Sequence, residues 1–402
     1  MKKILATAYD IDPYKGSESA TGWNFIYQIS RFNKVIAITR KNNKASIDRY
    51  IEEFNIDTSN MQFYYYDLPY WMRFWKKGAR GSSLYFYLWQ MFMPIFIKVK
   101  KIDFDIAHNV NFHTDAFPTF LWMLSKPTVW GTINHNEKIP SQYLSSNKAI
   151  IKENIKWNIK KLLWNFDIFI FLARKKSTIV LGGNSSVQLR LKIKTERFIS
   201  LSQVGSIENN FTRIIKNKFN ILVVGRFLTI KSFDIAIKSF AKFLNNNKLQ
   251  NDISLTIVGK GPKEKELKLL VRDLYIEEYV VFIDWIDKKD LDVIYQNSSL
   301  FLFPSHEGAG MVVVEALSFG LPVVCFNNYG PGELVDDSCG IRIDYSSYET
   351  SVIEFSEALQ ELYKNKEKYL QLSDGAIQKF KKEYEWNQKG LKLKDIYNGI
   401  EL

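Results

Sequence analysis

The sequence predicts an α/β protein made of two consecutive doubly wound domains. The chain has 402 residues, which is more than one ordinary hydrophobic core accommodates. Short apolar runs alternate with amphipathic, helix-like runs in two successive series, the pattern of parallel sheets whose strands are connected by helices. In addition, residues 299–326 have the pattern of strand, glycine-containing loop, helix and strand, which is a complete βαβ unit.

The first series occupies the amino-terminal half. Its expected strands are 4–8, 35–39, 62–67, 106–109 and 128–131. Its expected helices are 17–31, 84–100 and 116–124. The stretch 134–154 is polar and rich in Asn, Ser and Lys, so we expect a long loop or a mobile segment there.

The second series begins near residue 220. Its expected strands are 220–225, 254–259, 280–283, 299–304 and 322–326. Its expected helices are 233–244, 263–274, 291–297 and one that starts at about 311. We therefore expect a first domain over 1–205, a second over 206–385 and a carboxyl-terminal helix over 386–402.

Composition indicates which kinds of partner, disulfide and metal site to expect. The formal net charge of +12 favours acidic partners such as nucleotide phosphates, anionic lipid or nucleic acid. The two cysteines do not indicate a disulfide scaffold, and Cys325, at the end of an apolar run, is expected to be a core thiol. The four histidines lack the spacing of a zinc site. We therefore expect no metal and no other cofactor.

The chain shows no pattern of a leader or of a membrane-spanning helix. The apolar part of the amino terminus is too short for a secretory signal and is typical of a first strand. The uncharged aromatic run 84–97 is shorter than the roughly 20 residues that a spanning helix needs. We expect a cytoplasmic protein.

The βαβ unit at 299–326 predicts a ligand site. Its loop lies at the carboxyl edge of a parallel sheet, where a helix amino terminus presents free N–H groups that suit a phosphate. Glu307 in the loop and Glu315 in the helix are acids, so we expect them to bind hydroxyl-rich groups such as ribose and a sugar ring. The alternative is a buried helix with one capping and one solvated glutamate.

The segment 221–240 has the pattern of strand, glycine, short loop and helix. Arg226 and Lys231 stand five positions apart across its loop and converge on one anion at the end of the strand. Cations placed there stabilise a diphosphate leaving group as its negative charge develops. The alternative is a pair of solvated loop cations.

These motifs resemble those of a known family. The E-x7-E spacing with the tail EALxxGxPVV is similar to the donor site of the retaining glycosyltransferases of family 4, and residues 225–232 resemble their GRxxxxKG element, with Ser232 in place of the usual Gly. Residues 16–23 resemble the GSExxxGW signature of one subgroup. The resemblance covers most of the chain. It implies the GT-B fold, in which two Rossmann-like domains face each other across a cleft and the last helix packs on the first domain.

The resemblance also implies roles for individual residues. Glu307 and His108, the latter at the end of the strand at 105–107, would bind the donor sugar, while Arg226 and Lys231 would bind the diphosphate in a transfer that needs no metal. Further donor-binding positions are Gly16, Gly225, Gly259, Gly261, Gly308, Ala309, Gly310, Met311, Val312 and Glu315. The loop 330–335 either lines the diphosphate pocket or is an ordinary turn.

The sequence says less about how the acceptor binds than about how the donor binds. The loop 131–137 departs from the usual Gly-rich sequence of the subgroup, and we expect His135, Asn136 and Glu137 to contact the acceptor. Aromatic and basic residues alternate from 64 to 101, which suits the headgroup level of an anionic membrane; the alternative is a domain core with a solvated basic rim. No nucleic-acid module accompanies this segment, so we expect no nucleic acid as partner.

The expected function is that of a retaining glycosyltransferase. It would transfer a sugar from a nucleotide-sugar to a glycan acceptor, lipid-linked, in the synthesis of a bacterial surface polysaccharide (capsule, O-antigen or lipopolysaccharide), peripherally on the inner face of the plasma membrane. Three alternatives remain open: a glycoside hydrolase that uses Glu307 and Glu315, a catalytically silent GT-B protein that binds a partner, and a sugar-nucleotide epimerase.

Overall fold

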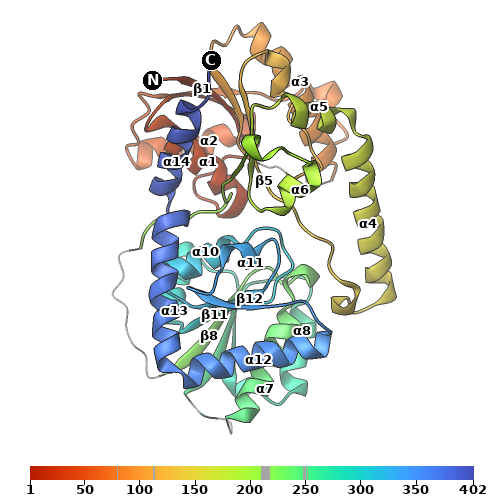
Figure 1. The fold of residues 1–402 in the computed structure, drawn as a ribbon, viewed down its shortest axis with the longest axis vertical. Coiled ribbons are helices and arrows are strands. Elements are labelled where there is room, and N and C mark those ends of the chain that lie inside the picture. The colour runs from red at the N-terminus through yellow and green to blue at the C-terminus, as the bar shows by residue number, and fades with distance from the viewer. Residues whose placement is uncertain (79, 112–113, 210–217, 248–249, 251) are drawn as a thin grey trace. The chain divides into compact units, whose positions relative to one another are not determined.

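The structure is a computed structural model that describes all residues except 79, 112–113, 210–217, 248–249 and 251 (Figure 1). The chain divides into two compact units. Unit 1 consists of Met1–His135, Asn158–Val204 and Trp386–Leu402, and unit 2 of Asn136–Trp157 and Gly205–Glu385. Residues 136–157, which the sequence analysis placed in the first domain, therefore pack with unit 2.

Unit 1 is built on a parallel sheet of seven strands in the order β3-β2-β1-β4-β5-β6-β7. The strands are β1 Lys3–Thr7, β2 Lys34–Thr39, β3 Met61–Tyr65, β4 Ile106–Asn109, β5 Thr128–Ile133, β6 Ile179–Gly182 and β7 Phe198–Ser200. The strand order reverses between β1 and β4, which is where doubly wound sheets place their ligands.

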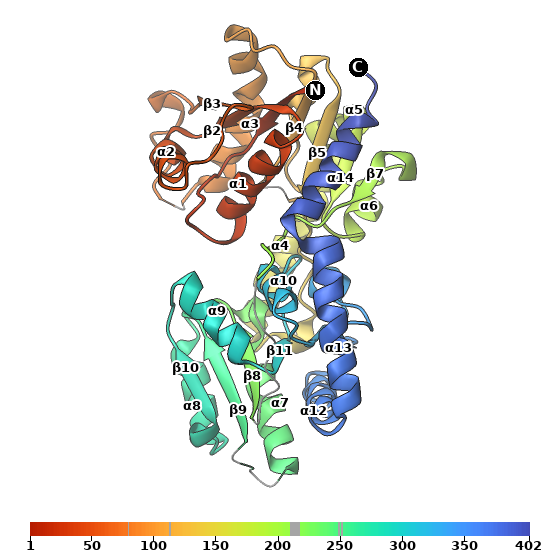
Figure 2. The same cartoon turned by 90° about the vertical axis from the view of Figure 1, so that its left-hand side faces the viewer.

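Helices cover both faces of this sheet. Alternate residues of β1 point to opposite faces, so Ile4 and Ala6 belong to one core cluster and Leu5 to another. The first cluster includes side chains from α1 (Ser17–Ser30), α2 (Lys44–Glu53) and α14 (Trp386–Asn398), and α1 and α14 lie side by side (Figures 1 and 2). The second includes side chains from α3 (Ser82–Val99). The remaining helices are α5 (Ile168–Lys176) and α6 (Ser186–Leu191).

Unit 2 is built on a parallel sheet of six strands in the order β10-β9-β8-β11-β12-β13. The strands are β8 Phe219–Val224, β9 Ile253–Val258, β10 Val280–Ile283, β11 Leu300–Phe303, β12 Val323–Phe326 and β13 Gly340–Ile343. The helices are α7 Phe233–Asn246, α8 Glu264–Asp273, α9 Lys288–Asn297, α10 Met311–Ser318, α11 Pro331–Leu334, α12 Tyr348–Lys364 and α13 Lys366–Lys379. Its strand order reverses between β8 and β11.

The segment 136–157 joins unit 2 through one aromatic anchor. Tyr143 is buried, and its ring lies 5.3 Å from that of Phe326. Its hydroxyl is 2.8 Å from the Ser351 hydroxyl and donates to the Ser346 carbonyl at 3.0 Å. The predicted loop ends at Asn147, where helix α4 (Asn147–Phe166) begins. The polar composition of this segment concealed both the anchor and the helix.

One further expectation is corrected. The helix predicted at 116–124 is absent from the structure, which has a 3-10 turn at Leu121–Leu124, because Pro118 disfavours helical geometry at the residue before it. In the aromatic–basic segment 64–101, the inward face of α3, with Trp89 and its neighbours, is buried against the sheet. Tyr70, Trp71 and Phe74 are exposed by 74%, 71% and 61%, so only the loop before α3 presents aromatic side chains to solvent. Among the described helices, none combines the length and the apolar character needed to cross a membrane.

Candidate functional site

The candidate site lies in unit 2, at the carboxyl ends of β8 and β11. Three loops meet there, those after β8, β11 and β12. The His306 N–H donates to the Ile230 carbonyl at 2.8 Å, which joins the first loop to the second. The Asn328 amide donates to the Ser305 carbonyl at 2.8 Å, which joins the third loop to the second. The site is thus formed at the point where the strand order reverses.

Lys231 and Glu307, predicted from separate motifs, form an ion pair. The Lys231 ammonium lies 2.5 Å from a Glu307 carboxylate oxygen, and both side chains are largely but not fully buried. The ammonium also lies 4.8 Å from the centre of the Phe303 ring, at the end of β11. A cation and a carboxylate are therefore held together, with part of each still accessible to a ligand.

Arg226 follows β8 directly and is exposed. Among the residues that the structure describes, its guanidinium has no hydrogen-bond or ion-pair partner. In contrast to Lys231, Arg226 is therefore free to bind an anion without breaking an existing contact.

The amino terminus of α10 supplies the predicted N–H groups. Gly308, Ala309, Gly310, Met311 and Val312 lead into the helix and form its first turn. The Gly308 N–H donates to the Asn136 side-chain oxygen at 2.6 Å. Asn136 was expected to contact an acceptor; the structure instead places its amide against the Glu307 loop, because residues 136–157 pack with unit 2.

Glu315, one helical turn after Met311, is held by two neighbours from α9. One of its oxygens accepts from the Tyr295 hydroxyl at 3.2 Å, and the other lies 3.4 Å from the Lys288 ammonium. Burial raises the pKa of the Glu315 carboxyl, and the Lys288 cation opposes this shift. Neither Tyr295 nor Lys288 was singled out from the sequence, because their relation to Glu315 depends on how α9 packs against α10.

Three glycines stand where the loops of this region come too close to each other for a side chain to fit between them. Gly259 has φ +147°, and a side chain there would overlap the carbonyl oxygen of Gly225. A side chain at Gly330 would overlap the carbonyl oxygen of Glu307. Gly261 packs on the backbone of Phe227 in the same region. The loop 330–335 thus lies directly against the Glu307 loop, which favours the pocket-lining interpretation over an ordinary turn.

His306, which the sequence already suggested as a residue that orients the Glu307 loop, and Asn328, which sequence reasoning missed, hold this loop. The His306 ring is buried, stacks on Phe326 at 5.0 Å and lies 2.9 Å from the Tyr345 hydroxyl. Asn328 accepts from the N–H groups of Gly330 and Gly332 at 3.0 and 3.2 Å. An Asn shortly before a G-P-G sequence was a signal for such a turn.

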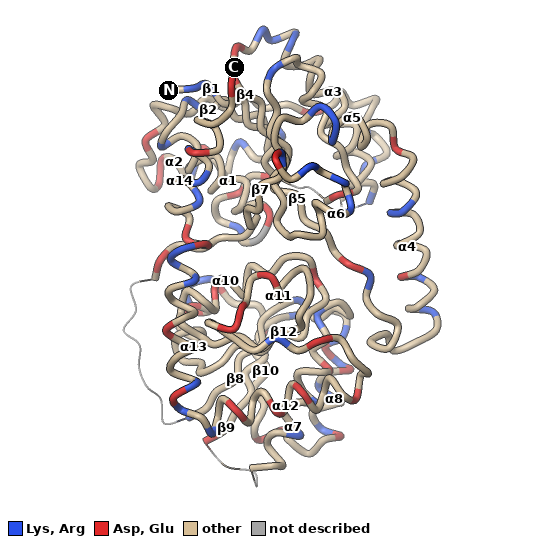
Figure 3. Tube along the Cα trace, in the orientation of Figure 1, with Lys and Arg blue, Asp and Glu red and all other residues tan. Residues whose placement is uncertain are grey.

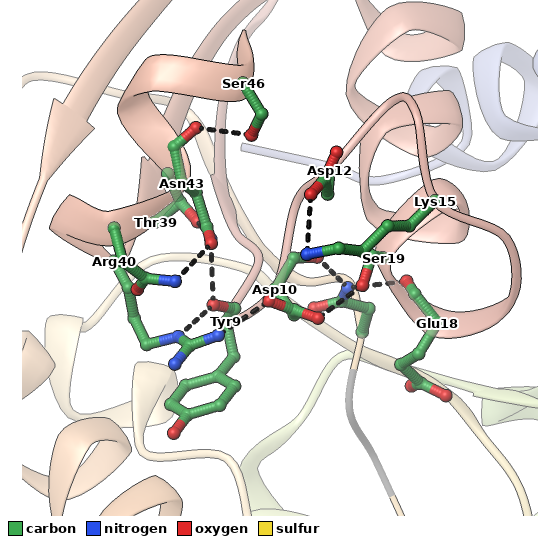
Figure 4. Close-up of polar contacts among 12 residues, drawn as sticks. Tyr9, Asp10, Asp12, Lys15, Glu18, Ser19, Thr39, Arg40, Asn43 and Ser46 are labelled. Carbon is green, nitrogen blue, oxygen red and sulfur yellow. Dashed lines mark hydrogen bonds and ion pairs between the residues drawn. The ribbon is translucent and has the colours of Figure 1, made fainter. Parts of the chain in front are cut away.

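In unit 1, the loop after β1 carries the residues of the GSExxxGW signature. Gly16 precedes α1 and is exposed, whereas Trp23 is buried in the core and Gly22 lies against the Asp10 carbonyl. Arg40 fixes this loop, since its guanidinium pairs with Asp10 at 2.6 Å and donates to the Tyr9 carbonyl at 2.9 Å (Figure 4). Part of the signature is therefore explained by packing alone.

His108 is corrected to a structural residue. It lies inside β4 and is fully buried. One ring nitrogen lies 2.6 Å from the Tyr397 hydroxyl of α14 and the other 2.6 Å from the Gly131 carbonyl. Both ring nitrogens are therefore occupied by the protein, which leaves neither for a donor sugar. Burial lowers the pKa of His108 to about 4.

The two remaining acceptor candidates belong to different units. His135 belongs to unit 1, is fully buried and pairs with Asp115 at 2.7 Å, so it is not placed to meet an acceptor. Burial lowers its pKa although Asp115 opposes this shift. Glu137 belongs to unit 2 and is half-buried. The pKa of the Tyr345 phenol is raised chiefly by burial, and the nearby Glu137 carboxylate adds to this rise.

Comparison with known proteins supports the interpretation of unit 2. Residues 207–379 match the model of the family described as Glycosyl transferases group 1. An uncharacterized glycosyltransferase of Haemophilus influenzae is 34% identical over 234 residues, which cover 54% of this chain and 64% of that protein. A UDP-Gal:alpha-D-GlcNAc-diphosphoundecaprenol alpha-1,3-galactosyltransferase of Escherichia coli is 23% identical over 59% of this chain and 61% of that protein. The matched part of this chain thus spans less than two thirds of each relative.

The fold is matched over the whole chain. The crystal structure of Anabaena Alr3699/HepE in complex with UDP and glucose superposes with a TM-score of 0.65 at 14% identity and covers 100% of both chains. The chain therefore has the GT-B fold, as predicted. Residues 207–379 are thus similar to group 1 glycosyltransferases, and the fold of the whole chain is similar to that of GT-B structures.

Proposed function

We propose that this protein is a retaining glycosyltransferase that transfers a sugar from a nucleotide-sugar to a glycan acceptor carried on a lipid, without a metal ion. Its pathway would be the synthesis of a bacterial surface polysaccharide. The observation that carries the proposal is the Lys231–Glu307 ion pair at the switch point of the unit 2 sheet.

The donor diphosphate would bind to the two cations after β8. Breaking the glycosidic bond transfers negative charge to the diphosphate, and Lys231 and Arg226 stabilise that charge more in the transition state than in the ground state. Arg226 adds a planar, bidentate donor that matches phosphate oxygens. The helix α10 contributes the positive end of its dipole and its first N–H groups.

The two glutamates would bind the sugar and the nucleoside. Glu307 lies next to the diphosphate cation, so its free oxygen reaches the hydroxyls of the sugar attached to that diphosphate. Glu315 lies farther along α10, with Tyr295 and Lys288 fixing its carboxylate, and is placed for the hydroxyls of a ribose. This division of roles assigns each acid to one half of the donor.

The proposal explains the site better than glycoside hydrolysis. A hydrolase needs one carboxylate as acid and a second as base or nucleophile at the same bond. Here Glu315 is engaged by α9 and Glu307 by a lysine, and hydrolysis of a simple glycoside produces no anion for Arg226 and Lys231. A catalytically silent protein would bind the donor without turnover, and an epimerase would release free nucleotide and sugar in the absence of acceptor.

The lipid-linked acceptor is supported by the E. coli relative, whose name specifies a diphosphoundecaprenol-linked substrate. The nucleotide is supported by the structural match, since the Anabaena protein was crystallised with UDP and glucose. For this chain, both assignments are proposals.

A two-step experiment tests the function. A panel of nucleotide-sugars is first screened by thermal shift, because a ligand that binds the folded state raises the melting temperature. The best donor is then incubated with diphosphate-linked lipid glycans, with and without EDTA, and the anomeric configuration of the product is determined by NMR. The expected product keeps the α or β configuration of the donor, and EDTA has no effect. Inversion, a requirement for divalent metal, or donor binding without transfer to any acceptor would each contradict part of the proposal.

A further inference from the structure

Helix α4 carries an apolar stripe that faces solvent along its length. The stripe consists of Ile151, Ile155, Ile159, Leu162 and Phe166, which are exposed by 58%, 56%, 53%, 58% and 80%. Scattered exposed apolar residues are ordinary on a protein surface, but five on consecutive turns of one helix are not. This stripe has no role in the proposed chemistry.

The spacing of the stripe places it on one side of the helix. At 3.6 residues per turn, the five side chains fall within an arc of about 80° and span about 22 Å along the axis. The opposite side carries Glu153, which is buried, and Trp157 and Trp164, which are half-buried. Helix α4 therefore packs through one face and presents a second apolar face outward.

Further exposed apolar residues follow α4 in the chain. Ile168 and Phe171 at the start of α5 are exposed by 58% and 42%, and the last turn of α5 carries Arg174, Lys175 and Lys176. Exposed apolar residues and cations are thus also present on the helix that follows α4.

The charges beside the stripe have one sign. The exposed charged residues of α4 are Lys148, Lys152, Lys156 and Lys161. The only acid of α4, Glu153, is buried and pairs with Lys156 at 3.1 Å. Figure 3 shows basic positions recurring along α4. An apolar face bordered by lysines is complementary to a surface that is apolar inside and anionic at its rim.

We propose that the α4 stripe, Ile151 to Phe166, is a docking surface for an anionic lipid bilayer, with α4 lying in the plane of the headgroups. The isoleucines, Leu162 and Phe166 would enter the boundary between headgroups and acyl chains, while the lysines would bind lipid phosphates. A second copy of the chain is a poorer occupant, since a two-fold contact through α4 would bring two rows of lysines together. This surface differs from the exposed loop Tyr70–Phe74. Its purpose rests on the proposed function, because an acceptor carried on lipid must be reached at the bilayer.

The test is vesicle sedimentation with the full chain. Wild type, the stripe variant Ile155→Glu/Ile159→Glu and the control Leu269→Glu/Val281→Glu are mixed with vesicles of phosphatidylglycerol and phosphatidylcholine, or of phosphatidylcholine alone, at low and high salt. The control replaces two apolar side chains that are each exposed by 51% and lie outside α4, so it matches the stripe variant in chemistry and charge. Melting temperatures of all three proteins confirm that they are folded.

Wild type and control are expected to sediment with anionic vesicles and to be released by salt, whereas the stripe variant loses at least tenfold in vesicle affinity. The variant Lys148→Gln/Lys152→Gln/Lys161→Gln is expected to lose the preference for anionic vesicles. The proposal is overturned if wild type ignores anionic vesicles at low salt or if the stripe variant sediments like wild type. It is equally overturned if light scattering shows a wild-type dimer that the stripe variant converts to a monomer.

A nucleotide-sugar thermal shift on the same samples distinguishes a failure of the docking proposal from a failure of the proposed function. If the nucleotide-sugar still raises the melting temperature of the stripe variant but the variant no longer sediments with vesicles, docking through α4 is supported. If wild type sediments with anionic vesicles but responds to no nucleotide-sugar, the proposed function fails and the docking surface stands.

Discussion

The Lys231 ammonium and the Glu307 carboxylate lie 2.5 Å apart although 76 positions separate them in the chain. Each was predicted from its own motif, Lys231 for a diphosphate and Glu307 for a sugar. Their contact means that the two roles are coupled: a ligand that binds one partner changes the environment of the other.

The Lys231–Glu307 contact predicts non-additive kinetics. Lys231→Ala and Glu307→Ala are each expected to lower kcat about a hundredfold or more, because each removes a transition-state contact and leaves its partner unpaired. The double variant is expected to lose less than the sum, with a coupling of about 0.5–3 kcal/mol. A double-mutant cycle on kcat with the best donor measures this. Strict additivity would show that the pair seen in the ligand-free protein has no role in turnover.

Arg226 is predicted to act in catalysis without stabilising the fold. Arg226→Ala is expected to lower turnover on the order of a hundredfold, since it contacts developing charge. Its side chain is exposed, so the melting temperature should stay within about 1 °C of wild type. Kinetics and calorimetry on the same preparation check both statements, with Arg272→Ala, a surface cation of α8, as the control. Near-normal turnover of Arg226→Ala would remove Arg226 from the diphosphate site.

Glu315 predicts a pH-dependent stability. The pKa of its carboxyl in the folded protein is raised, chiefly by burial, above the ordinary value of 4.5. The folded state therefore binds more protons than the unfolded state, and wild-type stability falls as pH rises from 4.5 through the folded pKa. Glu315→Gln cannot titrate, so its melting temperature should gain on that of wild type as pH rises through this window. A constant difference between the two proteins would contradict the raised pKa.

Glycine at 330 is predicted to be essential for the Glu307 loop. In Gly330→Ala, the added carbon would overlap the Glu307 carbonyl oxygen, so the loop must move, at a cost of about 1–3 kcal/mol in stability and with loss of turnover. Gly16→Ala is the control, since Gly16 has φ −81° and no neighbouring atom within 4 Å of the added carbon. Equal melting temperatures for the two variants would disprove the close contact of the loops.

His108 is predicted to make the fold sensitive to acid and to have no role in catalysis. Its pKa falls from 6.5 to about 4 in the folded protein because of burial, so the neutral ring stabilises the fold above pH 6.5 and this contribution is lost as pH falls toward 4. At 1.36 kcal/mol per unit, the effect is on the order of 3 kcal/mol. Denaturant unfolding between pH 7 and 4.5 should therefore show a smaller loss for His108→Gln than for wild type. A strongly reduced kcat in a stably folded His108→Gln would restore the catalytic assignment.

Local patterns in the sequence predicted the sheets well. β1 to β5 and β8 to β12 all fall within or beside the expected ranges, because each is an apolar run bounded by polar or glycine residues. β6, β7 and β13 were not predicted. Helix α4 was also missed. Its two apolar faces obscure the single-face periodicity on which helix prediction depends.

The site was predictable only where its residues follow strands. Lys231 and Glu307 follow β8 and β11, and the strand order brings such positions together. The contact of Asn136 with Gly308 spans 172 positions and that of His108 with Tyr397 spans 289. No local pattern reports contacts of this kind. They explain why Asn136 and His108 were assigned to ligands and why Tyr295 and Asn328 were overlooked.

The division of the chain between the units also determines when each unit can fold during synthesis. Unit 1 includes Trp386–Leu402, and Trp386, Leu393 and Tyr397 lie in its core. The ribosome makes these residues only after all of Gly205–Glu385, so the amino-terminal sheet emerges first yet lacks part of its core until unit 2 has been synthesised. The first domain of a chain usually folds while the second is being made, but unit 1 can complete its core only after unit 2 has been synthesised. Until α14 is added, the face of the β1–β4 sheet that it covers is exposed to chaperones and to other nascent chains.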